Sequence, residues 1–143
     1  MIYVAGFMFD HAYRQVLLIK KLKPSWQKNR YNGIGGKVEP QELPISAMVR
    51  EFSEETGVNT QPFDWVSFCD YEFSEGLVHF YYTVDKYNKY FSFATSTTEE
   101  EISRHYITEI LNIDTIYNLN WLIPLALDPS FDFPGTGPIK VRE

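Results

Sequence analysis

The sequence predicts an α+β domain in which a mixed β-sheet lies between helices. Apolar, β-rich runs occur in two pairs, each joined by a polar turn, and a strong amphipathic helical pattern separates the two pairs. A second, more apolar helical pattern follows near the end of the chain. With 143 residues, of which 44% are hydrophobic, the chain is long enough for one core but not for two, so we expect a single domain over residues 1–143.

The strands are expected in two hairpins. Residues 2–9 and 15–22 are β-rich runs on either side of a polar turn. Residues 63–73 and 77–85 form a similar pair around a Ser-Glu-Gly turn. Residues 89–95 are compatible with a further short strand.

Two helices are expected. Over residues 44–56 apolar side chains recur at intervals of four and three, and Gly57 is placed to end the helix. The stripe that should face the core consists of Ile45, Val49, Phe52 and Thr56. Residues 113–127 predict a mostly buried helix, and residues 104–111 a strand or a turn. The tail, 128–143, is rich in Pro and Gly and is expected to be irregular.

Composition limits the possible classes of function. Cys69 is the only cysteine, which excludes an intramolecular disulfide and a thiolate zinc cluster and fits a reducing, cytoplasmic compartment. The apolar run at the start is too short to cross a bilayer and lacks the flanks of a signal peptide, so we expect neither a membrane segment nor a leader. The sequence has no basic stripe with interleaved aromatic residues, so we expect no long nucleic acid as partner.

Charge is distributed unevenly along the chain. The net charge is −6, yet residues 1–37 carry seven basic side chains and one acidic one, whereas the rest carries six basic and eighteen acidic ones. A basic segment could attract phosphates, and an acidic body could hold divalent cations. The alternative is that this asymmetry does not survive folding.

Three carboxylates share one side of the predicted helix at 44–56. At 100° per residue, with Glu51 at zero, Glu55 lies at about 40° and Glu54 at about −60°. Like charges so close destabilise an exposed helix by a few tenths of a kcal/mol per pair. Mg²⁺ prefers carboxylate oxygens and would offset this repulsion, whereas a solvated acidic face without function is the alternative.

The spacing of these acids resembles the signature of the Nudix hydrolases. Gly36, five residues, Glu42, seven residues and then REFSEETGV agree with the Nudix box at every defining position, over 23 residues. The resemblance implies a Nudix-type α/β/α sandwich with a mixed β-sheet between helices. It also implies a Mg²⁺- or Mn²⁺-dependent hydrolase that acts on a small nucleoside di- or triphosphate-type substrate, as a monomer or homodimer.

The resemblance assigns roles to particular side chains. Its implied metal ligands are the backbone carbonyl of Gly35 and the carboxylates of Glu51, Glu54 and Glu55. Glu42 and Arg50 are implied as a pair that supports these ligands, which is also compatible with an ordinary loop-to-helix salt bridge.

The general base is implied to be a box glutamate, with Glu54 as the candidate, or an acid from a later loop. Glu101, with Glu100 beside it, stands at a spacing that resembles the later-loop acid of the MutT-like branch. A solvated helix start is the alternative for this acidic run. His79 and His105 are expected to be strand residues and not catalysts.

Two stretches resemble the oxidised purine nucleoside triphosphatases. In YNGIGGKVE, Asn32 corresponds to an asparagine that contacts the base, with an Asn-Gly turn as the alternative. In NLNWLIPLAL, Asn118 stands near the position of a base-reading acid. The chain departs from that pattern because an amide replaces the acid and because Ile116 or Tyr117 stands where a tryptophan is expected. This departure leaves the preference for oxidised guanine open.

Other side chains complete the candidate substrate site. Trp26 and Tyr31 could stack on a base, and Lys23 and Lys37 could contact phosphates. ADP-ribose and dinucleoside polyphosphates are alternative substrates, and a nucleotide-sensing Nudix domain without catalysis is the alternative class. Every metal position of the box is intact, which favours an enzyme.

Overall fold

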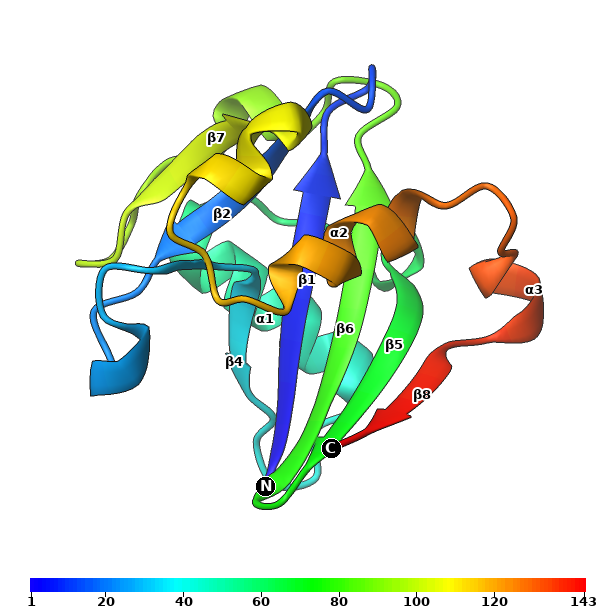
Figure 1. The fold of residues 1–143 in the computed structure, drawn as a ribbon. Coiled ribbons are helices and arrows are strands. Elements are labelled where there is room, and N and C mark those ends of the chain that lie inside the picture. The colour runs from blue at the N-terminus through cyan, green and yellow to red at the C-terminus, as the bar shows by residue number, and fades with distance from the viewer.

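A mixed sheet of eight strands runs through the computed structural model, which describes residues 1–143, with helices on both faces (Figure 1). The strands are β1 Ile2–Phe9, β2 Gln15–Lys20, β3 Tyr31–Asn32, β4 Ile34–Lys37, β5 Val66–Phe73, β6 Gly76–Val84, β7 Ile102–Tyr106 and β8 Ile139–Arg142. The helices are α1 Pro44–Thr56, α2 Leu119–Leu127 and α3 Phe133–Thr136. Short 3-10 turns occupy Ser25–Gln27, Pro62–Asp64, Phe91–Phe93 and Ile107–Asn112.

The strand order is β3-β2-β1-β6-β5-β8, with β4 also paired to β1 and β7 to β2. The central pair, β1 and β6, is parallel, as is the pair of β5 and β8, whereas the other pairs are antiparallel. Both predicted hairpins are present, β1 with β2 and β5 with β6. The α+β class and the mixed sheet are therefore confirmed.

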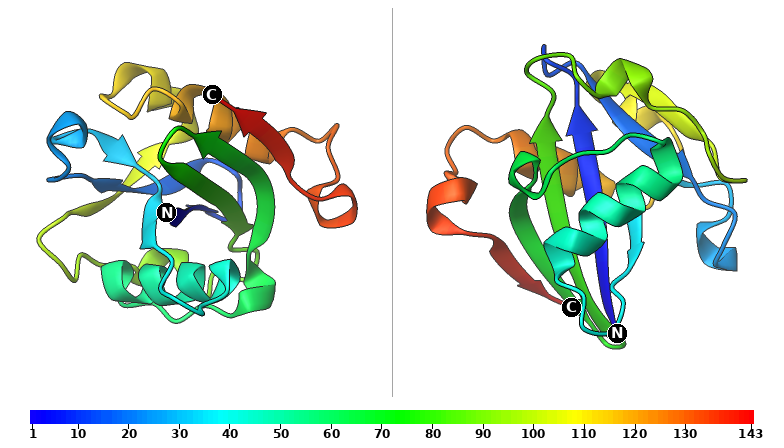
Figure 2. Two further views of the ribbon diagram at one scale, coloured as in Figure 1. Left: turned by 90° about the horizontal axis from the view of Figure 1, so that it is seen from below. Right: turned by 180° about the vertical axis from the view of Figure 1, so that it is seen from behind.

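Helices α1 and α2 lie on opposite faces of this sheet, as the views from below and from behind show (Figure 2). The core accordingly has two parts, one under α1 around Phe52 and one under α2 around Phe68. The Phe52 ring meets Trp65 edge-on with ring centroids 5.1 Å apart. A Cβ on Gly6 of β1 would lie 2.6 Å from Met48 Cε, so the glycine permits the close approach of α1 to the sheet.

Helix α1 has the bounds that the sequence predicts. Pro44 occupies its first turn, and Gly57 follows it with a φ of 75°, in the left-handed region that glycine tolerates. The Gly57 N–H donates to the Ser53 carbonyl at 2.9 Å. The expected stripe is rotated, however, because Ala47 and Met48 are buried together with Phe52 and Thr56, whereas Ile45 and Val49 are only half-buried.

Several expectations for the second half of the chain were wrong or incomplete. The range 89–95 holds a 3-10 turn in place of a strand. The range 104–111 contains the end of β7 and then another 3-10 turn, which agrees with the expected strand or turn. The predicted helix at 113–127 begins only at Leu119. The tail is not irregular, because it forms α3 and then β8, which pairs with β5.

Two smaller expectations concern histidines and membranes. His79 and His105 lie on β6 and β7, as expected, and His79 Nδ1 is 2.7 Å from Asp70 Oδ1. No helix combines the length and the apolar character that crossing a membrane would need.

Candidate active site

Strand β4 and helix α1 bring two glycines against the first carboxylate of the helix. A Cβ on Gly36 would lie 2.5 Å from the carboxylate of Glu51. A Cβ on Gly35 would collide with the Val4 carbonyl oxygen on β1. Only glycine therefore fits at position 35, and a side chain at position 36 would push the Glu51 carboxylate away from its place directly over the β4 backbone.

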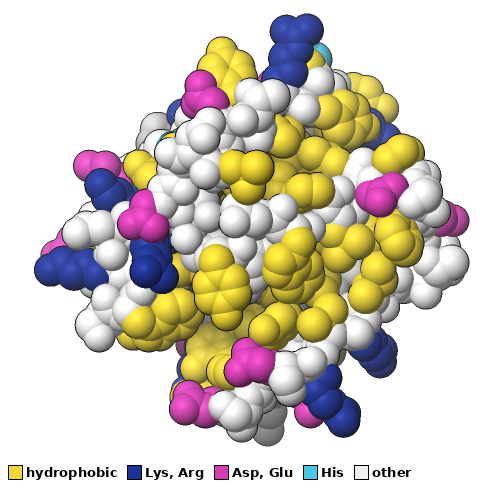
Figure 3. Space-filling view, in the orientation of Figure 1, with side chains coloured by type: hydrophobic (Ala, Val, Ile, Leu, Met, Phe, Trp, Pro, Cys, Tyr) yellow, Lys and Arg dark blue, Asp and Glu magenta, His cyan; other side chains and the backbone are white.

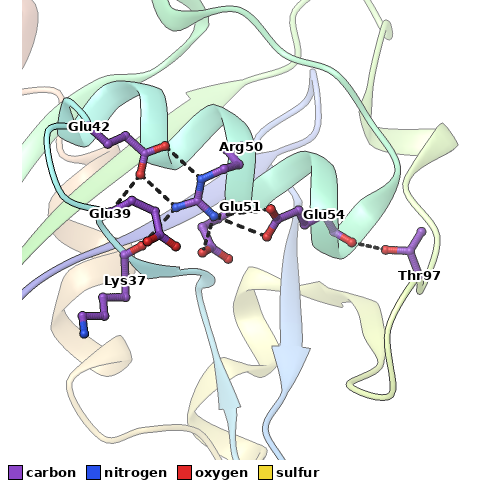
Figure 4. Close-up of polar contacts among 7 residues, drawn as sticks. All are labelled: Lys37, Glu39, Glu42, Arg50, Glu51, Glu54 and Thr97. Atoms are coloured by element: carbon purple, nitrogen blue, oxygen red, sulfur yellow. Dashed lines mark hydrogen bonds and ion pairs between the residues drawn. The ribbon is translucent and has the colours of Figure 1, made fainter.

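Arg50 joins the loop, the strand end and the helix (Figure 4). Its Nε and Nη2 donate to the two carboxylate oxygens of Glu42, each at 2.9 Å, and Nη2 also donates to the Lys37 carbonyl at 3.0 Å. Its Nη1 donates to Glu51 at 2.9 Å and lies 3.4 Å from the carboxylate of Glu54. The fork-like guanidinium is the side chain best suited to such a set of contacts.

The electrostatics of Glu42 follow from this geometry. The hydrogen bonds from Arg50, and then that from the Glu39 N–H at 3.0 Å, lower the pKa of Glu42 from its ordinary 4.5 to about 2. In return, Glu42 raises the pKa of Arg50. The pair expected from the sequence is therefore formed, and it holds the loop after β4 onto α1.

The acid arc, defined as Glu51, Glu54 and Glu55, has excess negative charge. Burial raises the pKa of Glu51 and of Glu55, and the neighbouring carboxylates raise both further. The hydrogen bond from Arg50 lowers the pKa of Glu51, and the hydrogen bond from Thr98 lowers the pKa of Glu55, so both partly offset this effect. The Glu54 carboxylate is more exposed, and its only contact is the long one to Arg50.

As these side chains stand, no group of three or more His, Cys, Asp or Glu is arranged to hold a metal ion. The chemistry of the donors nevertheless fits one. Glu51, Glu54 and Glu55 supply the hard oxygen atoms that Mg²⁺ and Mn²⁺ prefer, and a divalent cation would offset the repulsion among half-buried carboxylates. The backbone carbonyl of Gly35 lies on the strand that Glu51 contacts.

A loop that precedes β7 closes the end of α1. Thr95 N donates to the Thr56 carbonyl at 3.0 Å and Thr97 N to the Glu55 carbonyl at 3.4 Å, while the Thr97 hydroxyl donates to the Glu54 carbonyl. The last carbonyls of a helix have no partner within the helix, and this loop supplies hydrogen-bond donors to them. These contacts were not predicted, although the hydroxyl-rich run TSTT is typical of segments that cap backbone groups.

Thr98 connects the acid arc to the later acidic run. Its hydroxyl donates to Glu55 Oε2 at 3.0 Å and accepts from the Glu100 N–H at 3.2 Å. The Glu100 carboxylate in turn accepts from Lys21 Nζ at 3.1 Å and from the Leu22 N–H at 2.6 Å. One hydroxyl group therefore joins the Glu55 carboxylate on α1 to the backbone of Glu100 in the loop before β7.

Glu100, and not Glu101, is the acid that faces the arc. The Glu100 side chain is only 14% exposed and its charge raises the pKa of Glu55, whereas the Glu101 side chain is exposed and its carbonyl accepts from Lys20 N. The hydrogen bonds to Lys21 and to the Leu22 N–H hold the Glu100 side chain in place, and none is made to the Glu101 side chain. The run is a bend that leads into β7, so the alternative of a helix start was wrong.

A cleft of about 720 Å³ begins at the two glycines and extends over the sheet. Five residues predicted for the site line it, namely Gly35, Asn32, Lys37, Trp26 and Asn118. Lys23 does not line it, because the chain turns after β2 so that Lys21 and Pro24 do instead. Figure 3 shows hydrophobic side chains around a hollow in the lower half of this face, and Lys and Arg side chains to its left.

Comparison with known families explains this arrangement. Residues 1–128 match the family model of the NUDIX domain. The chain belongs to the Nudix family. A comparison with curated protein sequences gives no match.

Solved structures have the same Nudix fold. A MutT of Aliivibrio salmonicida or Vibrio cholerae is 20% identical with a TM-score of 0.68, over 87% of this chain and 94% of that one. The Nudix domain of Shewanella oneidensis NrtR in complex with ADP ribose is 16% identical with a TM-score of 0.68, over 92% and 88%. A bifunctional NMN adenylyltransferase/ADP ribose pyrophosphatase of Francisella tularensis with AMP and a Mn ion is 15% identical with a TM-score of 0.71, over 89% and 41%. Identities this low show a shared fold alone.

The two asparagines that line the cleft of this Nudix domain, Asn32 and Asn118, differ in their hydrogen bonding. Asn32 Oδ1 accepts from the Gly33 N–H at 2.7 Å, and its Nδ2 donates to Gln27 at 3.2 Å. Asn32 ends strand β3 and no turn is assigned at Asn32-Gly33, so the alternative of an Asn-Gly turn was wrong. Asn32 also lines the cleft. Asn118 Oδ1 is buried and has no hydrogen-bond partner.

Aromatic side chains form much of the cleft, and most of them were not predicted. Trp26 and Tyr117 are 58% and 70% exposed and can reach a ligand. Tyr31 packs edge-on against His105 at 4.5 Å and does not line the cleft. Further lining residues without a signal in the sequence are Tyr3, Tyr71, Phe73, Phe80 and Glu143. They come together only because β1, β5, β6 and the end of the chain lie side by side.

Proposed function

We propose that this Nudix domain is a divalent-metal-dependent pyrophosphohydrolase that cleaves a nucleoside triphosphate to a monophosphate and pyrophosphate. The observation that carries the proposal is the complete Nudix box, in which Arg50 holds Glu42 and Glu51 while Glu51 lies against Gly36, a residue that lines the cleft. A modified purine deoxynucleotide is one possible member of this substrate class.

The proposed roles follow from position. Glu51, Glu54, Glu55 and the Gly35 carbonyl would hold Mg²⁺ or Mn²⁺, which neutralises phosphate charge and activates water. Arg50 and Glu42 orient these ligands, as hydrogen-bonded partners of metal ligands do. This part of the site therefore serves the chemical step.

Two lysines would attract the phosphates, and an acid outside the acid arc would accept a proton from the attacking water. Lys21 and Lys37 line the cleft and would attract the phosphates. Glu100, which Lys21 and the Leu22 N–H orient, is our candidate for the group that accepts a proton, ahead of Glu54 and the more exposed Glu101.

ADP-ribose is the second candidate substrate. The Shewanella and Francisella neighbours are described with ADP ribose or as an ADP ribose pyrophosphatase. The aromatic cleft would accept an adenine as readily as another base. A domain that senses a nucleotide without cleaving it is the remaining alternative.

A substrate panel tests the proposal. The protein is incubated with Mg²⁺ and the common and oxidised nucleoside triphosphates, ADP-ribose or a dinucleoside polyphosphate, and the products are separated by ion-exchange chromatography. We expect monophosphate and pyrophosphate from a triphosphate, no turnover in excess EDTA, and recovery with Mg²⁺ or Mn²⁺. Undiminished turnover in EDTA contradicts the metal dependence, and binding without any turnover favours the sensing domain.

A further inference from the structure

We propose that Glu143 is a specificity-determining residue of the cleft, whose carboxylate accepts N–H groups from a guanine-type base. This inference rests on the proposed function, because it concerns which nucleotide the cleft prefers. It adds to the Nudix box a residue that lies far from the box in the sequence.

The strand register places Glu143 at the opposite end of the cleft from the glycines. Lys37 pairs with Tyr3, Tyr3 with Val78, and Val78 with Tyr71. Each step between neighbouring strands is about 4.8 Å, so Lys37 and Tyr71 are roughly 14 Å apart along the sheet. A nucleotide with its phosphates near the glycines would therefore have its base near Tyr71.

Glu143 is held at this end by the backbone and by one side chain. Its N–H donates to the Glu72 carbonyl at 2.9 Å, which continues the pairing of β8 with β5. The Tyr71 hydroxyl donates to Glu143 Oε2 at 3.0 Å, and the Tyr71 ring packs against Trp121 of α2 at 6.1 Å. Burial, and then the contact with Glu143, raise the pKa of Tyr71, so the phenol keeps the proton that it donates.

Two acceptor atoms at this end of the cleft have no hydrogen-bond partner within the protein. No protein donor contacts Glu143 Oε1, and Asn118 Oδ1 has no partner. The Asn32 amide, in contrast, is already bonded to Gln27 and Gly33. A ligand that satisfies these two atoms must bring hydrogen-bond donors.

A guanine edge meets this requirement best. Guanine presents the N1–H and the 2-amino group side by side, and a carboxylate has acceptor sites for both in addition to the Tyr71 hydroxyl. Hypoxanthine lacks the 2-amino group, and adenine presents an acceptor at N1 that a carboxylate repels. Hydrogen bonds to a charged acceptor are about twice as strong as neutral ones, so the carboxylate should discriminate among these bases.

The test is calorimetric binding of GMP, IMP and AMP in EDTA, which needs no metal and no turnover. We expect the wild-type protein to bind GMP more tightly than IMP and at least about tenfold more tightly than AMP. Glu143→Gln should lose most of that preference, mainly through weaker GMP binding. Tyr71→Phe removes the hydroxyl group that holds the Glu143 carboxylate in place, so this variant should lose part of the preference for GMP.

Glu72→Gln is the matched control, because Glu72 does not line the cleft and its carboxylate pairs with Arg142 at 3.3 Å. It should bind all three nucleotides as the wild type does, and the thermal midpoint of each variant reports whether it folds. Equal binding of GMP and AMP by the wild type, no binding of any of the three, or an unchanged preference in Glu143→Gln overturns the inference. Hydrolysis of triphosphates in Mg²⁺ without base preference would leave the proposed function intact, whereas GMP preference without any hydrolysis would refute only that function.

Discussion

The glycine end and the aromatic end of the cleft differ in how many of their polar groups already have partners within the protein. At the glycine end, Arg50 contacts three carboxylates and a carbonyl, and Thr98 joins Glu55 to Glu100. At the aromatic end, Asn118 Oδ1 has no partner and Tyr117 is exposed. The first end is organised before a substrate arrives, as catalysis requires, whereas the second leaves hydrogen-bonding capacity for the ligand. Changes at the first should alter turnover and stability, and changes at the second should alter substrate preference.

The largest effect is expected from Glu55→Gln. The change keeps the size of the side chain but removes one charge of the acid arc, so turnover at saturating Mg²⁺ should fall by roughly a hundredfold or more. The thermal midpoint without metal should stay the same or rise slightly, because repulsion within the arc decreases by a few tenths of a kcal/mol. Near-normal turnover together with a lower midpoint would mean that the arc serves packing alone.

Arg50→Ala should have the largest effect on stability. It leaves Glu42 and Glu51 without their main partner, and we expect the free energy of unfolding to fall by about 2 kcal/mol in urea titrations. Arg50→Lys should recover only part of this loss, since an ammonium group cannot make the two parallel bonds to Glu42. A loss below about 0.5 kcal/mol for Arg50→Ala would show that the network contributes little beyond a surface ion pair.

Acid should weaken the same network through Glu42. Its pKa is about 2 in the folded protein and ordinarily 4.5, so its contribution is complete above pH 4.5 and is lost as the pH falls toward 2. The difference in unfolding free energy between the wild type and Glu42→Gln should therefore be largest near neutral pH and shrink below pH 4.5. A difference that does not change between pH 7 and pH 3 would contradict this assignment.

Thr98→Val should have a smaller effect, which concerns the Mg²⁺ concentration that the enzyme requires. Without the hydroxyl, Glu55 and Glu100 lose their shared contact, and the Mg²⁺ concentration for half-maximal turnover should rise by about tenfold. Thr98→Ser should restore it, because serine keeps the hydroxyl. Thr95→Val is the control, since Thr95 holds α1 only through its backbone, and an equal effect in that variant would point to general loosening of the loop.

The glycine end could be predicted from the sequence because its spacing is local. Glu42, Arg50 and the acid arc lie within one loop and one helix, where intervals of residues determine which side chains are neighbours. The same local reasoning placed the end of α1 at Gly57.

The remaining features depend on contacts between distant segments. The core stripe of α1 includes the small side chain of Ala47, whose burial is set by how the helix packs on β1 and not by hydropathy. Glu100 and Glu101 are identical neighbours, and only contacts with the distant segment at Lys21 and Leu22 distinguish them. Strand β8 and Glu143 follow a segment rich in Pro and Gly, and their position depends on pairing with β5.

The most direct test of the central claim, that the acid arc is a divalent-metal site, is a Mn²⁺ titration of the substrate-free protein followed by electron paramagnetic resonance. Glu55→Gln is compared with the wild type and with Glu99→Gln, which removes the same charge from an exposed position on the loop before β7. We predict that the wild type and Glu99→Gln bind Mn²⁺ equally and that Glu55→Gln binds it at least about tenfold more weakly. Equal Mn²⁺ binding by all three proteins would contradict the account.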